Sequence, residues 1–136
     1  MDTGKILFKI LKNIKRLVIR NLSGELTFLE FKCLKIAYTT PLTQKKMIEE
    51  TGMTKGTVSK ALKSLENKGF VTRRRVGREY EVRLTEKGEA VMEKFEKIAS
   101  EINKTLLNGF TEHEKLTLHT LLEKMLKNLE HIEDKT

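Results

Sequence analysis

Apolar residues recur at helical spacing in the segment 54–68, and the rest of the chain can be read around it. One face, at positions i, i+3, i+4 and i+7, holds Val58, Ala61, Leu62 and Leu65. The opposite face is small, polar and cationic, and it holds Gly56, Ser59, Lys60, Lys63 and Asn67. The pattern therefore predicts a helix with one side for a protein core and another side suited to a DNA major groove.

The neighbouring segments predict a helix-turn-helix followed by a wing. A shorter helix is expected over 43–51, with Gly52 in the turn at positive φ. Within residues 70–84, positions 79–84 alternate between charged and apolar residues and Gly77 marks a turn, which predicts a two-stranded hairpin with an arginine-rich tip. A helix-turn-helix followed by such a hairpin is a winged helix.

Apolar residues at helical spacing predict four further helices on either side of this unit. They cover about 4–22, 27–38 and 86–108, and a last helix runs from Thr111 through Ile132. Two of them begin with a threonine and a glutamate at capping-box spacing, Thr27 with Glu30 and Thr111 with Glu114. The predicted fold class is therefore mainly α with a small β-hairpin wing.

The flanking helices carry more apolar surface than a monomer of this size can bury, so a second copy is expected to cover them. We accordingly expect three parts: an N-terminal dimerisation helix at 1–22, a winged helix-turn-helix DNA-binding domain at 23–84, and C-terminal dimerisation helices at 85–136.

The net charge of +8 over 136 residues favours a polyanionic partner. The charge is uneven, because residues 43–83 carry 11 Lys/Arg and 5 Glu, whereas residues 1–22 carry 6 Lys/Arg and 1 Asp. Residues 111–136 are net acidic, with 4 Lys and 6 Asp/Glu. The positive charge thus lies on the predicted winged helix and the first helix. A charge that only keeps the protein soluble is the plainer alternative.

Motifs for catalysis or metal binding are absent from the sequence. It contains no P-loop, no GxGxxG after a strand and no Cys/His cluster, so we expect no enzyme, metal or cofactor. His119 and Glu123 are spaced i, i+4, but a structural zinc site normally needs four ligands. The single Cys33 cannot form an internal disulfide, and there is no secretory signal or long apolar span, so we expect a cytoplasmic protein. Cys33 is expected to be a small core residue, with oxidant sensing as the alternative.

A series of short motifs resembles the MarR family of transcriptional regulators. The motifs are Leu26-Thr27, Val58-Ser59, Leu65-Glu66, Lys68-Gly69-Phe70, Arg73-Arg74, Arg78 and Leu84-Thr85-Glu86-Lys87-Gly88. The resemblance covers nearly the whole chain, because the flanking helices match in number and length. It implies a homodimer with interlocked terminal helices and an inverted-repeat operator in double-stranded DNA. It also implies a small aromatic or anionic effector between the dimer helices and the winged helix.

The predicted DNA contacts lie on two elements. The helix 54–68 is expected to enter the major groove with its N-terminal half, and the hairpin to place Arg78 in or near the minor groove. The candidate DNA-binding residues are Thr43, Thr54, Lys55, Gly56, Thr57, Ser59, Lys60, Lys63, Arg73, Arg74, Arg75 and Arg78. The three consecutive arginines would hold phosphates. Alternatively, they form a solvated strand with Glu79 and Glu81 as cross-strand partners.

The hairpin departs from the family pattern, which carries an aspartate two residues before the wing arginine. That position is Val76 here, and the hairpin is about three residues shorter than in the family. Two other functions stay open, a non-specific architectural DNA-binding protein and a winged-helix module that binds protein. The small basic face of the segment 54–68 argues against the protein-binding module. The basic first helix could also lie on a membrane, but we expect it to pack within a dimer.

Overall fold

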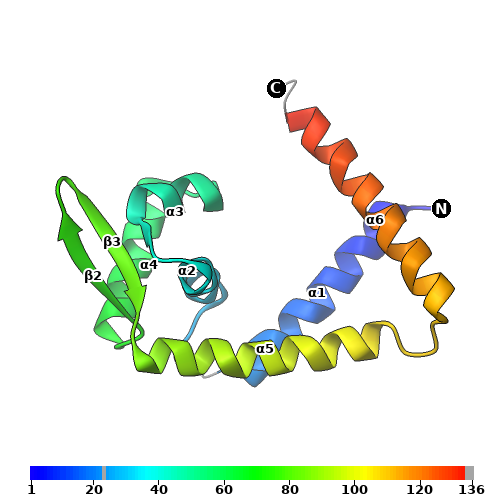
Figure 1. Cartoon of the computed structure of the whole chain (residues 1–136), viewed down its shortest axis with the longest axis horizontal. Coiled ribbons are helices and arrows are strands. Elements are labelled where there is room, and N and C mark those ends of the chain that lie inside the picture. Colours follow the sequence, from blue (N-terminus) through cyan, green and yellow to red (C-terminus); the bar gives the residue numbers. More distant parts are fainter. Residues whose placement is uncertain (23, 134–136) are drawn as a thin grey trace. The chain divides into compact units, whose positions relative to one another are not determined.

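The computed structural model describes residues 1–22 and 24–133, and the chain forms two compact units, Met1–Ser100 and Glu101–Thr136 (Figure 1). Ser23, where the winged-helix segment was expected to begin, and residues 134–136 lie outside the described residues. The elements in chain order are α1 (Thr3–Asn21), α2 (Phe28–Thr39), β1 (Leu42–Thr43), α3 (Gln44–Thr51), α4 (Lys55–Asn67), β2 (Val71–Val76), β3 (Glu79–Leu84), α5 (Glu86–Leu106) and α6 (Glu112–Glu133). The predicted mainly α fold with a β-hairpin wing is confirmed.

The helices begin where capping chemistry predicts. Thr27 Oγ1 accepts the backbone N–H of Glu30 at 3.1 Å, and the Glu30 carboxylate accepts the N–H of Thr27 at 3.0 Å, which completes a capping box. The hydroxyl of Thr54 caps α4 by accepting the N–H of Thr57 at 3.2 Å. The turn before α4 contains Gly52 at a φ of 68°, as expected from its position.

The sheet has one strand more than the predicted hairpin. Its antiparallel order is β1-β3-β2, and Leu42 and Thr43 of β1 pair with Val82 and Glu81 of β3. A strand of two residues is too short to produce an alternating pattern, so the sequence offered no signal for it. Thr43 was expected inside the α3 helix, but it is the N-cap, and its hydroxyl accepts the N–H of Lys46 at 3.1 Å.

The core of the first unit lies between α4 and the elements that pack on it, α2, α3 and β2. The face of α4 predicted to be apolar is buried in full: Val58, Ala61, Leu62 and Leu65. Met47 from α3 and Phe70, just before β2, are fully buried as well. Burying one large apolar side chain stabilises a fold by about 1.5–3 kcal/mol. These contacts therefore hold α4 in one rotational setting about its axis.

A buried carboxylate joins the start of α2 to α4. Glu30 is only 4% exposed, and its Oε2 accepts the hydroxyl of Ser64 at 2.7 Å. Lys68, just past the end of α4, donates from Nζ to both carboxylate oxygens at 3.0 and 3.1 Å. Burial alone would raise the pKa of the Glu30 carboxyl, but the hydrogen bonds it accepts, first from Ser64, lower that pKa below its ordinary value.

Gly88 sets the distance between α5 and the base of the wing. A Cβ atom at this position would lie 2.2 Å from the carbonyl oxygen of Phe70, which no side chain can tolerate. The same carbonyl accepts the backbone N–H of Thr85 at 3.0 Å. Glycine is therefore required in the Leu84–Gly88 motif because the helix begins against backbone.

The long helices keep much of their apolar surface exposed in the single chain. On α5, Val91 and Phe95 are only partly covered and Leu106 is 42% exposed. Met92 and Gly88 are the buried residues of this helix. In α6 no described residue is buried. These open stripes are the surfaces that a second copy is expected to cover, and their burial by such a copy stays a prediction.

Replacing Glu30 by Gln is expected to destabilise the fold by about 2–3 kcal/mol near neutral pH, because a buried ionised acceptor is lost. The folded pKa lies below the unfolded pKa. The carboxylate therefore stabilises the fold above the ordinary value of 4.5, and this contribution is lost as the pH falls through the folded value. Urea unfolding should separate wild type from Glu30→Gln at pH 7, and the difference should be smaller at pH 3.

The control is Glu114→Gln, which changes the exposed glutamate of the second capping box, Thr111 with Glu114. Its effect should stay below about 1 kcal/mol at both pH values. A difference between wild type and Glu30→Gln that did not depend on pH would contradict the role of the ionised carboxylate.

Candidate nucleic-acid interface

The outward face of α4 presents small and cationic groups from its first turns. Thr54 and Thr57 share a hydrogen bond of 2.7 Å between their hydroxyls, so the two side chains are held together at the helix start. The candidate residues of α4 that are exposed are Lys55, Gly56, Lys60 and Lys63, and Ser59 is partly buried. No ion pair engages these lysines among the described residues, so their charge is available to a polyanion.

Gly56 has no structural reason to be glycine in this chain. A Cβ atom built at this position meets nothing within 4 Å, and its φ is not positive. Within a helix, glycine is less favourable than alanine by about 1 kcal/mol. The absence of a side chain therefore leaves the helix backbone open to the outside of the molecule rather than serving the fold.

The wing extends beside α4, with its tip directed away from the start of α5 (Figure 1). Gly77 and Arg78 form the two-residue turn, and Gly77 has a φ of 64°. Arg78 is exposed at this turn. Arg74 is exposed and lies opposite Glu81 in the register of β2 and β3. These two arginines place positive charge on one strand of the wing and at its tip.

Arg73 differs from its two neighbours. Its side chain is only 18% exposed, and Nη2 lies 3.2 Å from Oε1 of Glu66 in α4. Nη1 donates to Oε1 of Gln44, the first residue of α3, at 3.3 Å. Arg75 is exposed, and its Nε donates to the carbonyl of Gly77 at 3.3 Å. Arg73 is thus placed at the base of the wing, and the other arginines are placed on its surface.

Tyr80 belongs to this surface, although sequence reasoning treated it only as part of the strand pattern. It is 43% exposed and lies opposite Arg75 in the sheet. The guanidinium carbons of Arg73 and Arg75 lie 5.5 and 5.8 Å from the centre of its ring. An aromatic residue within an arginine-rich hairpin was the signal that could have identified it.

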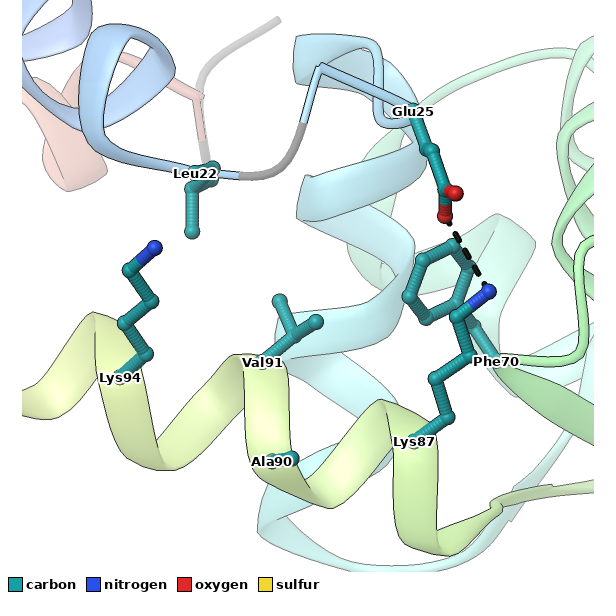
Figure 2. A pocket seen from close by; sticks show the side chains of 7 residues that line it. All are labelled: Leu22, Glu25, Phe70, Lys87, Ala90, Val91 and Lys94. Atoms are coloured by element: carbon teal, nitrogen blue, oxygen red, sulfur yellow. Dashed lines mark ion pairs between the residues drawn. The ribbon is translucent and has the colours of Figure 1, made fainter.

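A small pocket lies between the end of α1, the segment before α2 and the start of α5 (Figure 2). Its volume is about 240 Å³, and it is lined by Leu22, Glu25, Phe70, Lys87, Ala90, Val91 and Lys94. Lys87 Nζ lies 3.1 Å from Oε2 of Glu25 and 4.5 Å from the centre of the Phe70 ring. Figure 2 shows Lys87 and Lys94 rising from α5 on either side of Val91. The pocket thus has an apolar floor, and its rim carries the ammonium group of Lys94 and the ion pair of Lys87 with Glu25.

Cys33 is fully buried in α2, in agreement with its expected place in the core. Burial raises the pKa of its thiol, which reduces the thiolate form that oxidants attack. No helix within residues 1–22 and 24–133 is long and apolar enough to cross a membrane.

Comparison with known proteins places this geometry in a family. The sequence profile of the HVO_A0261 N-terminal domain matches residues 31–106. An HTH-type transcriptional regulator of Bacillus anthracis is 33% identical over 111 residues, covering 78% of this chain and 74% of the relative.

Solved structures of MarR regulators match nearly the whole length of the chain. A MarR transcriptional regulator from Methanosarcina mazei Go1 superposes with a TM-score of 0.83 at 26% identity, covering 97% of this chain and 94% of that one. The reduced form of MarR from E. coli gives a TM-score of 0.77 at 26% identity, over 93% and 97% of the two chains.

BpsR of Bordetella bronchiseptica, whose DNA binding is regulated by 6-hydroxynicotinic acid, shares the fold. Its TM-score is 0.71 at 20% identity, over 90% of this chain and 96% of that one. The winged helix, the flanking helices and the matched relatives all indicate the same family. The chain therefore belongs to the MarR family of winged helix-turn-helix transcriptional regulators, with residues 31–106 forming an HVO_A0261 N-terminal domain.

Proposed function

We propose that this protein is a dimeric, sequence-specific regulator that reads an inverted repeat in double-stranded DNA. The observation that carries the proposal is the outward face of α4, where a backbone left open at Gly56 lies among exposed lysines. A recognition helix needs close approach to base edges, and it needs cations for the flanking phosphates. The buried opposite face holds this surface in place.

The recognition helix α4, the wing and α3 each have a separate role in this proposal. Thr54, Lys55 and Thr57 approach the backbone at the helix start, and Ser59, Lys60 and Lys63 reach into the major groove. Arg78, at the exposed tip of the wing, enters the minor groove, where a narrow A·T-rich segment attracts arginine. Thr43 caps α3, and Arg74 and Arg75 lie along the phosphates beside the wing.

The unpartnered helices supply the dimer interface of the proposal. On α1, residues on several sides are apolar and 39–74% exposed: Ile6, Leu7, Phe8, Ile10, Leu11, Leu17 and Ile19. On α6, the apolar residues that are 36–68% exposed are Leu116, Leu121, Leu122, Met125, Leu126, Leu129 and Ile132. In this proposal a second copy covers these apolar surfaces. The segments 1–22 and 85–136 then form the dimer interface, and the segment 23–84 binds DNA. The protein is expected in the cytoplasm.

The pocket at the start of α5 supports regulation by a small aromatic carboxylate. Phe70, Val91 and Leu22 offer an apolar floor, and the ammonium group of Lys94 offers charge to a carboxylate, whereas Lys87 is already paired with Glu25. BpsR, which shares the fold, is regulated by a compound of this chemical class, 6-hydroxynicotinic acid. Phe70 lines the pocket, is fully buried and lies in the chain between α4 and β2. An occupant therefore contacts the segment that joins the recognition helix to the wing.

Gly56→Ala is expected to leave the fold as stable or up to about 1 kcal/mol more stable, because the added methyl group meets nothing. Lys60→Ala removes an exposed cation from the same face. Both should weaken binding to an operator selected from genomic fragments by about tenfold, the usual cost of losing a base or close-backbone contact. Titrations of a labelled operator, and of scrambled DNA of the same length, measure this.

Lys97→Ala is the matched control, because it removes an exposed lysine from α5 and not from the recognition helix α4. An inverted repeat with half-site centres about 10 bp apart should be protected in footprinting. Protection without sequence preference would support the architectural alternative, and binding without salt dependence would support a protein-binding module. Equal binding of Gly56→Ala and wild type would contradict the proposal that the open backbone at Gly56 approaches DNA.

Light scattering at micromolar concentration should give twice the 15.8 kDa of one chain. Leu126→Glu places a charge on the apolar surface of α6, where the side chain is 56% exposed in the single chain, and should shift the protein towards monomers or aggregates. Lys124→Glu, on an exposed neighbour, should leave the dimer intact. A well-folded monomeric wild type would end the dimer proposal.

Isothermal titration with benzoate or 6-hydroxynicotinic acid should detect binding that benzamide, a neutral analogue, does not reproduce. Lys94→Met removes one ammonium of the pocket rim and should weaken carboxylate binding by about tenfold, the cost of one charge-assisted hydrogen bond. Lys97→Met is the control on the same helix. Equal affinity for benzoate and benzamide, or an unaffected Lys94→Met variant, would show that the pocket does not select carboxylates.

A further inference from the structure

We propose that Arg73 is a positioning residue that fixes the wing on the recognition helix, and that it is not a phosphate contact. The inference rests on the proposed DNA-binding function, and it divides the three consecutive arginines by role. Arg73 acts through the wing, whereas Arg74 and Arg75 are exposed and can meet DNA.

The guanidinium of Arg73 joins three elements. It extends from the third residue of β2 and holds Glu66 at 3.2 Å, near the end of α4, through Nη2. Through Nη1 it holds Gln44 at 3.3 Å, at the start of α3. A planar guanidinium can donate from two nitrogens in fixed directions, whereas a lysine offers one flexible point charge. Both helices of the helix-turn-helix are thus tied to the wing by one side chain.

The side chain is enclosed as well as paired. It is 18% exposed, and its Nε is buried with no hydrogen-bond partner within the described part of the chain. The ring of Tyr80 lies 5.5 Å from the guanidinium carbon. Reaching a phosphate would break both hydrogen bonds and expose the Glu66 carboxylate, already 38% exposed, to a like-charged backbone. These costs favour the anchored position.

The sheet register explains why neighbours in sequence differ in role. Successive side chains of a strand point to opposite faces, so Arg73 and Arg75 share one face and Arg74 lies on the other. On the shared face Arg73 lies opposite the fully buried Val82, whereas Arg75 lies opposite the exposed Tyr80. Arg73 is therefore the arginine at the buried end of the hairpin.

The anchor matters because the wing acts at a distance from it. Arg78 lies in the turn, three strand residues and the turn beyond Arg73, which is about 13 Å at the usual rise of a strand. A rotation of about 10° at the base would move the tip by about 2 Å, enough to break a hydrogen bond. A side chain that holds the base to α3 and α4 therefore decides whether helix and wing engage DNA together.

Arg73→Lys separates positioning from phosphate contact, because it keeps the charge and loses the double anchor. We expect about tenfold weaker operator binding, within the range for contacting residues that act as a unit. A phosphate contact would instead be nearly preserved by lysine. Glu66→Met tests the anchor independently of Arg73. Removing a negative charge would by itself tighten binding to a polyanion. Loss of the anchor should instead weaken operator binding by about threefold. Glu81→Met removes an acid from the other face of the wing and should bind as tightly as wild type or more tightly.

Hydrogen exchange without DNA tests the anchor directly. The amides of β2 and β3 should exchange faster in Arg73→Lys and Glu66→Met than in Glu81→Met, and the amides of α4 should be unchanged in all three. If wild type bound no operator, the proposed function would fail while exchange still decided the anchor. Wild-type-like exchange and binding in Arg73→Lys, or tighter binding by Glu66→Met, would overturn the positioning role.

Discussion

Burial of one face of α4 is the constraint on which the rest of the molecule depends. Val58, Leu62 and Leu65 are fully enclosed, so the helix cannot turn about its axis without exposing them. With 3.6 residues per turn, the groups opposite that stripe have no other place than the outer surface. The chemistry presented to a ligand is therefore decided by packing on the far side of the same helix.

Two polar anchors then orient the helix against its neighbours. Glu30 receives Ser64 and Lys68 from the end of α4, and Arg73 holds Glu66 from the side of the wing. Ion pairs that lose water on burial add little net stability over apolar packing, but their directions are strict. Apolar contacts thus supply most of the stability of this unit. The two polar clusters restrict the orientation of α4 relative to α2 and to the wing.

Local chemistry made much of the fold predictable from the sequence. The Thr27–Glu30 capping box, the left-handed Gly52 and the stripe of α4 each depend on residues within a few positions of one another, and the structure confirms them. The contacts of Glu30 with Ser64 and of Arg73 with Gln44 span 34 and 29 residues, and no local pattern reports such pairs.

The same limit applies to the candidate site. The outward face of α4 follows from helical period, but an arginine run gives no sign of which member turns inward, because that depends on what lies beneath the strand. The two-residue strand β1 gave no signal because it is too short for periodicity. The stripe of α5 is partly open in the single chain, and its burial depends on the second copy that is expected to cover it.

The two-residue turn of the wing has a consequence for how the family can vary its reach. Strand side chains alternate with a period of two, so adding one residue to each strand at the tip would swap the faces only of residues beyond the insertion. The base, from Val71 to Arg73 and from Val82 to Leu84, would keep its register and its anchors. Wing length is thus a modular property: the tip can be extended or trimmed over generations while the seat of the hairpin stays the same.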